Sequence, residues 1–428
     1  MKFVPCAALL CVSMAACAQA QPQASHDWSL AAVLERVSSA NRDVQAAQRA
    51  LDEATADKLS AGVTPPAQFS ILSQAIDPDR LGHGSAWNRP VDTIFRIDKT
   101  FERGNKQALR VRQAEAGAAA AGHDLAYTLR TQRIAAAQAY WDLKLAQEQL
   151  SISGHDRQLA QGSSDTARLR QEQGDLSRLE ATRLAVEADR AANEESEARR
   201  HLFEAQSALA QALALPSTQI ATLHAADPWP ADAPEAQRAQ GAPITADDEA
   251  WLAQRADVTA ATQRVNQAQA AADLAQSQRK ADVTWSVQFE HNPPAGNRLW
   301  GVGVAFPLGV DERQTGPVTH ALLAVQEAQA QLDKVREAAL AERAVQQQAW
   351  SSASERVRRI EAQWLPRARE ALKAAEFARE QGALALQDVL DARRALHAVE
   401  LEAASAHADQ AKAWAALTMT EETHEVTP

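Results

Sequence analysis

Asp43–Ala47 (DVQAA) is repeated 214 residues later as Asp257–Ala261 (DVTAA), near the start of each half of the chain. A second pair follows in the same order, Glu172–Leu176 (EQGDL) and Glu380–Leu384 (EQGAL), 208 residues apart. Two matching pairs at nearly equal offsets are the pattern of an internal duplication. Because a duplicated unit of this kind does not close a core alone, the repeat favours an assembled, symmetric object over an enzyme with one cleft.

Each half is expected to contain a helix, two strands and a long helical hairpin. The helices that open the halves are expected at 29–61 and 247–280, and the strands at 67–76, 91–101, 283–291 and 299–307. We divide the chain into a signal peptide (1–20), a first repeat (29–215), a proline-rich equatorial linker (216–245), a second repeat (246–417) and a C-terminal tail (418–428).

The long helices of the two halves are expected to match in length. Helical pattern runs from Lys106 to Gly174 and from about Pro317 to Gly382, and at 1.5 Å per residue each run spans about 100 Å. Equal lengths suit a cylinder with flush ends. Pro366 lies inside the second run and is expected to kink it, because proline removes a helical hydrogen bond.

The return helix after Gly174 carries a stripe of ten positions at coiled-coil spacing, nine of which are apolar. Most are alanine, which permits close approach between helix axes and predicts a slender seam for another helix. The stripe consists of Ala181, Leu184, Ala188, Ala191, Glu195, Ala198, Leu202, Ala205, Leu209 and Ala212.

Composition agrees with a mainly α chain that carries a small β part. Aromatic residues make up 5% of the 428 residues and the formal net charge is −11, so the chain is a poor nucleic-acid binder.

The first 20 residues have the pattern of a secretory signal peptide. Two processing sites compete: cleavage after Ala18-Gln19-Ala20, or a lipobox that leaves Cys17 as a lipidated N-terminus. The three cysteines all lie in this leader, so no disulfide or thiolate metal site is expected in the processed chain.

The strands of the second half alternate apolar with polar or tiny residues. On one face the alternation places Trp285, Val287 and Phe289, followed by Trp300, Val302 and Val304. No stretch after the leader approaches the ~18 consecutive apolar residues of a spanning helix, so any membrane crossing is expected to be by strands whose apolar face meets lipid. Four strands do not close a barrel, whereas three copies give twelve. The soluble alternative is a short sheet that caps a helical stalk.

The ordered motifs resemble those of the TolC family of bacterial outer-membrane factors across roughly residues 30–417. The carriers are Asn41–Val44, Arg255–Val258, Trp364–Ala368 and the two tip segments around Gly174 and Gly382. Residues 101–107 (FERGNKQ) and 306–309 (FPLG) are similar to segments of the cobalt–zinc–cadmium efflux branch, although Asn105 and Gln107 depart from its pattern, and the 306–309 segment lacks the branch's first proline.

The resemblance implies a homotrimer in the outer membrane, with a twelve-stranded β-barrel in lipid and a helical tunnel (α-barrel) in the periplasm. It implies a periplasmic adaptor and a proton-driven inner-membrane pump as partners, heavy-metal cations as cargo, no cofactor and no enzymatic activity. Drug efflux and type I secretion remain alternative roles within the family. More remote rivals are a periplasmic adaptor, which has one hairpin, and a structural coiled-coil protein.

The candidate site residues lie at the hairpin turns. Gly174, Leu176 and Ser177 in the first turn, with Gly382 and Leu384 in the second, are expected to dock the adaptor; the alternative is that these glycines supply only the turn conformation. Asp388 and Asp391 could form carboxylate rings that gate the lumen, or could complement a helix start. The histidines on helices, His397 among them, are expected to stand alone without a neighbouring carboxylate, so no metal site is predicted.

Overall fold

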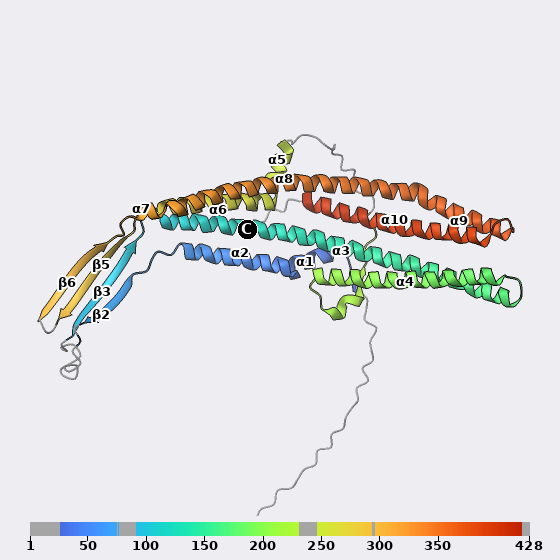
Figure 1. Ribbon diagram of the computed structural model, residues 1–428, viewed down its shortest axis with the longest axis horizontal. Coiled ribbons are helices and arrows are strands. Elements are labelled where there is room, and N and C mark those ends of the chain that lie inside the picture. Colours follow the sequence, from blue (N-terminus) through green and yellow to red (C-terminus); the bar gives the residue numbers. More distant parts are fainter. Residues whose placement is uncertain (1–25, 75, 77–90, 231–245, 293–295, 422–428) are drawn as a thin grey trace, which may run out of the picture.

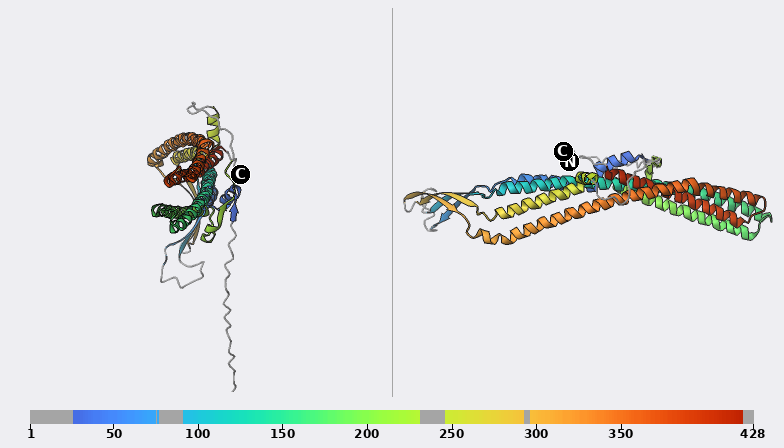
Figure 2. Two further views of the ribbon diagram at one scale, coloured as in Figure 1. Left: turned by 90° about the vertical axis from the view of Figure 1, so that its right-hand side faces the viewer. Right: turned by 90° about the horizontal axis from the view of Figure 1, so that it is seen from above.

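The computed structural model describes residues 26–74, 76, 91–230, 246–292 and 296–421. The signal peptide, Cys17, the 77–90 loop and residues 231–245 of the linker lie outside the described residues. The molecule is long and narrow, with a sheet at one end and both hairpin turns at the other (Figures 1 and 2). Most of it is helical, as expected, and no helix in the described ranges is both long and apolar enough to span a bilayer.

The two halves follow the same order of elements, which agrees with the internal duplication. The first half contains α1 (Leu30–Ala40), α2 (Arg42–Ala61), β2 (Gln68–Gln74), β3 (Asp92–Phe101), α3 (Lys106–Glu172) and α4 (Arg178–Ala212). The second half contains α5 (Ala246–Gln254), α6 (Ala256–Ser277), β5 (Val283–Asn292), β6 (Asn297–Ala305), α7 (Val310–Arg313), α8 (Thr315–Arg359), α9 (Leu365–Glu380) and α10 (Leu386–Glu421).

The short helices accompany the long ones over complementary stretches. On the sheet side of the middle, α2 packs on α3 and α6 packs on α8; toward the tips, α4 packs on α3 and α10 packs on α8 and α9. Helix α3 also contacts α6 and α10, which belong to the other half. The two halves therefore lie side by side along their whole length (Figure 1).

A break at Asn41 divides the helix that was expected to run unbroken from Ser29 to Ala61. Asn41 has extended backbone (ψ 134°), and its side-chain oxygen accepts hydrogen bonds from the backbone N–H groups of Asp43 and Val44. Its side-chain amide donates to the carbonyl of Ala212. Asparagine favours this capping position, so the prediction of one helix was wrong. Arg255, also extended, divides α5 from α6 at the corresponding place, but without a side-chain cap.

The two long helices match in length but not in regularity. Helix α3 is continuous over 67 residues, whereas its counterpart consists of α8 with 45 residues, a π-helical turn of 5 residues (Ile360–Trp364) and α9 with 16 residues. The π turn ends two residues before Pro366, whose missing N–H cannot continue the α-helical hydrogen-bond ladder. The helix is thus disturbed next to Pro366, where the kink was expected.

The linker was expected to be non-helical, and the chain was expected to have four strands. Its described part instead contains a 3₁₀ helix (Ser217–Thr222) and strand β4 (Leu223–Ala225), which pairs in parallel with β1 (His26–Trp28). Strands of three residues carry no readable periodicity, so sequence reasoning missed both. The hydroxyl of Tyr140 fixes this region, because it donates to the carbonyl of Trp28 and accepts from the N–H of Asp227.

The four strands predicted from alternation form one antiparallel sheet in the order β2-β3-β5-β6. The observed bounds lie within two residues of the expected ones. Since β3 pairs with β5, each half contributes one hairpin to the sheet. At its base, Lys106 Nζ donates to Asp282 and to the carbonyl of Lys280, which ties the start of α3 to the strand of the other half.

Candidate functional site

One face of the sheet is apolar and exposed. Register places Val302 opposite Val287, Val287 opposite Ile97, and Ile97 opposite Phe69, so that one row crosses all four strands. The side chain of Val302 is 74% exposed. The neighbouring rows on the same face contain Ile71, Phe95, Phe289 and Trp300, then Lys99, Trp285 and Val304, then Phe101 and Val283.

These four rows cover about 20 Å along the strands at ~3.3 Å per residue. That extent is close to the ~25 Å apolar band of outer-membrane strands. The one charge within the rows, Lys99, directs its ammonium group to the carbonyl of Pro65 at 2.7 Å, beyond the end of the strand. Its charge therefore lies at the edge of the band, where a long basic side chain reaches polar surroundings.

The opposite face of the sheet is polar or small. Arg96 pairs with Asp98 at 2.9 Å, and the Oγ of Thr100 is 2.9 Å from that of Thr284. Gly303 faces Ser286 so closely that a Cβ built on this glycine would lie 2.5 Å from the serine hydroxyl. The face also contains apolar exceptions, Leu72, Ile94 and Leu299, at the end far from the helices.

Both hairpin turns at the opposite end use the same backbone arrangement. Gly174 (φ 84°) follows α3 and Gly382 (φ 71°) follows α9, each in the left-handed region that favours glycine. Each glycine N–H donates three residues back, and the next N–H donates five residues back, which closes a Schellman motif. The glycines thus have a clear conformational role, and Leu176 and Leu384, which follow them, are half-buried.

Ser177 caps α4 with its hydroxyl. The Oγ accepts from the N–H of Glu180 and donates to the Glu180 carboxylate at 2.9 Å. This hydroxyl, and then Arg379, lower the pKa of Glu180. The second turn has Ala385 at the position of Ser177 and no equivalent side-chain cap, so the two tips differ in chemistry.

Asp388 and Asp391 are exposed at the start of α10. Asp388 lies in the first helical turn, where a carboxylate complements the helix dipole. Asp391 accepts from Arg394 and from Gln387, both at 3.1 Å. Their role as lumen-lining rings stays a proposal, because the structure contains one chain.

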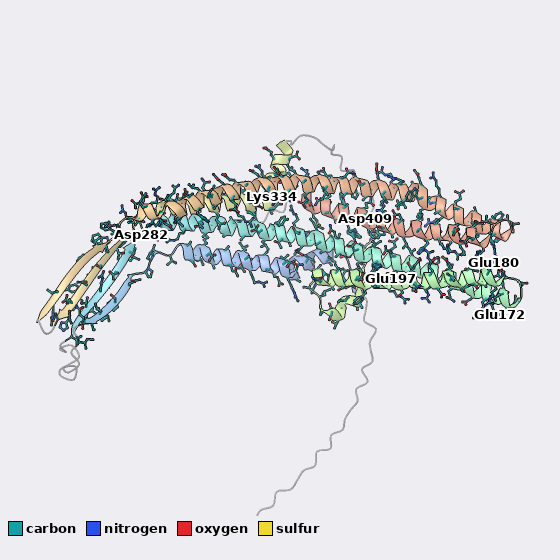
Figure 3. All side chains as sticks on the ribbon, in the orientation of Figure 1. Glu172, Glu180, Glu197, Asp282, Lys334 and Asp409 are labelled. Atoms are coloured by element: carbon teal, nitrogen blue, oxygen red, sulfur yellow. The ribbon has the colours of Figure 1, made fainter. Side chains whose placement is uncertain are left out.

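A ladder of contacts near the tips connects α4 to the second hairpin, and sequence reasoning missed it. Its carboxylates are Glu180, Glu187 and Glu194, seven residues apart, so they share one face of α4. Their partners are Arg379 at 3.3 Å, Arg394 in a two-pronged contact, and His397 at 3.4 Å, respectively. Figure 3 shows Glu180 beside the turns, far from Asp282 at the sheet.

Of the three glutamates in the ladder, Glu187, which pairs with Arg394, has the least exposed side chain. Arg394 lowers the pKa of the Glu187 carboxyl, chiefly through its hydrogen bonds, and the carboxylate in turn raises the pKa of the guanidinium. A heptad spacing of glutamates on a helix with an alanine seam is a signal that could have revealed this ladder. The positions of the partners could not be read, since they lie more than 190 residues away.

The third rung borders a cavity of about 740 Å³ between α3, α4 and α10. His397, Glu194 and Asp156 bring one potential metal-ligand atom each, and these atoms lie within 4.8 Å of one another. The expectation that His397 lacks a carboxylate neighbour was therefore wrong. Nothing in the rest of the described chain resembles this arrangement of potential ligands.

Comparison with known proteins agrees with this geometry. Residues 249–420 match the family described as "Outer membrane efflux protein". The cobalt-zinc-cadmium resistance protein CzcC of Cupriavidus metallidurans is 26% identical over 385 residues, which cover 87% of this chain and 85% of CzcC.

Solved outer-membrane proteins share the fold. The outer membrane protein VceC of Vibrio cholerae superposes with a TM-score of 0.72 at 20% identity, covering 92% of this chain and 95% of VceC. The CmeC outer membrane channel of Campylobacter jejuni gives a TM-score of 0.77 at 16% identity, covering 92% of this chain and 85% of CmeC.

Proposed function

We propose that this chain, which belongs to the outer membrane efflux protein family, is the outer-membrane exit duct of a tripartite efflux system. It is an outer-membrane protein, and its family and fold are those of channels rather than enzymes.

The apolar face of the β2-β3-β5-β6 sheet carries the proposal. Twelve side chains in its four rows are apolar, and the most exposed of them, Trp300 and Val302, are about three-quarters exposed. A four-stranded sheet leaves two free edges, each with unpaired backbone groups that a bilayer core does not tolerate. Three copies pair these edges into twelve strands, with the apolar face toward lipid and the Arg96–Asp98 face toward a water-filled lumen.

The tips are the proposed contact with a periplasmic adaptor. Leu176 and Leu384 occupy equivalent places after the two Schellman glycines, Gly174 and Gly382. The α3–α4 turn, which contains Ser177, and the α9–α10 turn lie at the end farthest from the sheet (Figure 1). Two chemically distinct tips per chain would give a trimer six contacts of two kinds. An inner-membrane pump, proton-driven in this proposal, supplies the energy, because the duct itself performs no chemistry.

Heavy-metal cations are the proposed cargo. The support is the similarity to CzcC, whose name assigns it to cobalt, zinc and cadmium resistance. Asp388 and Asp391, exposed at the mouth, would add carboxylate rings that favour cations in a trimer.

Two measurements test the proposal. The purified protein in planar bilayers is expected to give discrete conductance steps, and a chain that gives none is not a duct. A deletion strain is expected to become sensitive to Zn²⁺, Co²⁺ or Cd²⁺ and to be restored by the wild-type gene. Sensitivity to organic drugs alone would keep the duct and reject the metal cargo.

A further inference from the structure

We infer that Asp156, Glu194 and His397 form a binding site for a divalent cation of the Zn²⁺ class, which joins the two hairpins of one chain. Asp156 is on α3 and Glu194 on α4, whereas His397 is on α10 of the other half. The site lies on the wall of the 740 Å³ cavity. It is separate from the sheet, the turns and the proposed lumen carboxylates.

Distances favour coordination with small side-chain adjustments. Zn²⁺ binds imidazole nitrogen and carboxylate oxygen at about 2.1 Å, which places two ligands of a tetrahedral site roughly 3.4 Å apart. His397 Nε2 and Glu194 Oε2 already lie 3.4 Å apart. The Asp156 oxygen lies within 4.8 Å of the ligand atoms of both other residues. Rotation of the half-buried Asp156 carboxylate would shorten these two distances to those of a tetrahedral site. The cavity leaves room for a water molecule at the fourth position.

The environment of His397 suits a metal ligand. Its side chain is 13% exposed, and its Nε2 is buried without a hydrogen bond to any described residue. The Glu194 carboxylate is held in orientation by Arg190, because its Oε1 accepts a hydrogen bond from Arg190 at 2.9 Å while its Oε2 faces the imidazole of His397. Partners that orient a ligand in this way are the usual outer support of a metal site.

The charges around the cavity leave this cluster negative. The lining residues include three arginines. Arg190 pairs with one oxygen of Glu194 at 2.9 Å, Arg394 is engaged by Glu187 and Asp391, and Arg393 lies 3.7 Å from Glu376. No lysine or arginine among the described residues forms an ion pair with Asp156. The lining carboxylates outnumber the arginines and comprise Asp156, Glu187, Asp189, Glu194 and Glu197.

The third rung of the ladder therefore differs from the first two. There, an arginine of the second hairpin pairs with the glutamate. Here, the partner from the second hairpin is the His397 imidazole, the arginine on Glu194 comes from α4 itself, and Asp156 adds a second carboxylate. One nitrogen and two oxygen donors suit Zn²⁺ and its neighbours better than Mg²⁺ or Ca²⁺, which take mostly oxygen ligands. Because the three ligands come from both halves, a bound ion restrains the hairpins relative to each other near the tips.

The test uses the full-length protein, purified in detergent without a polyhistidine tag and stripped with EDTA. Titration with Zn²⁺ by calorimetry is expected to show one ion per chain, and Co²⁺ is expected to give the visible absorption of a nitrogen- and oxygen-ligated ion. His397→Gln, Glu194→Gln and Asp156→Asn should each weaken Zn²⁺ binding at least about tenfold. His320→Gln, an exposed histidine on α8, is the matched control and should bind as the wild type does.

Wild-type protein that binds no Zn²⁺, or His397→Gln protein that binds as tightly as wild type, overturns the inference. Asp156→Asn guards against misfolding, because Asp156 makes no ion pair with the described residues whose loss would weaken the fold. The inference does not rest on the proposed cargo. Binding is measured on purified protein, whereas conductance and metal tolerance test the duct, so the two can fail separately.

Discussion

Replacing Val302 by arginine tests the orientation of the sheet. Val302 lies in one of the two inner rows of the apolar face, between Trp300 and Val304 on its own strand, and it is 74% exposed. An arginine near the bilayer midplane costs about 2–4 kcal/mol per chain, or about 6–12 kcal/mol for a trimer. That loss is comparable to the whole stability of many folded proteins. Val302→Arg is therefore expected to abolish insertion.

The assay is the amount of trimer in outer-membrane fractions, measured on unheated gels. Gln68→Arg is the matched control, because Gln68 lies one row from Val302 in register but on the polar face, opposite Asp98. It should cost at most about 1 kcal/mol per chain, as exposed polar substitutions do. If Val302→Arg assembles as well as Gln68→Arg, the apolar face does not meet lipid and the duct proposal loses its main support.

Three further predictions concern the helical part. Arg394→Ala should lower the unfolding temperature by the equivalent of about 1–2 kcal/mol, allowing for the exposure of the arginine. Because the pKa of Glu187 is lowered in the fold, this difference should be complete above the ordinary glutamate pKa and should fade as pH falls through the lowered pKa; a difference that stays constant with pH would contradict the ion pair. Asn41→Ala removes a cap and two side-chain amide contacts and should cost about 2 kcal/mol in thermal unfolding. Gly174→Ala should lower the free energy of unfolding by about 1–2 kcal/mol through its positive φ alone, since no neighbouring atom lies within 4 Å of the added methyl group. Gly162→Ala is the control: this glycine is equally uncrowded but helical, so alanine should slightly raise the free energy of unfolding.

The strands and long helices could be read from the sequence because their signals are local. Alternation around Trp285 and Trp300 specified two strands and their apolar face, and proline at position 366 marked the irregular turn. The break at Asn41 was missed although its capping of Asp43 and Val44 is local; the contact of its side-chain amide with Ala212 lies far along the chain and could not be read. The parallel pair of β1 and β4 was missed because three-residue strands take their stability from the surrounding core.

The approach of His397 to Glu194 was equally unreadable. Each residue lies on its own helix with no local metal pattern, and only the packing of α10 against α3, with α4 alongside, brings them together. The glutamate spacing on α4 indicated a shared face but not what that face meets. The sequence thus predicted the helices and strands, whereas the contacts between the two hairpins could be identified only once the packing of the helices was known.

The π turn at Ile360–Trp364 has a consequence for any ring built from this chain. One long helix of each protomer is uninterrupted, and the other contains a single widened turn about two-thirds of the way to its tip. Around a threefold axis, three hairpins with an uninterrupted long helix would therefore alternate with three hairpins whose long helix contains the π turn. The six hairpins around the mouth would then bend in two different ways. A docking ring with sixfold symmetry would meet two mechanically different kinds of neighbour.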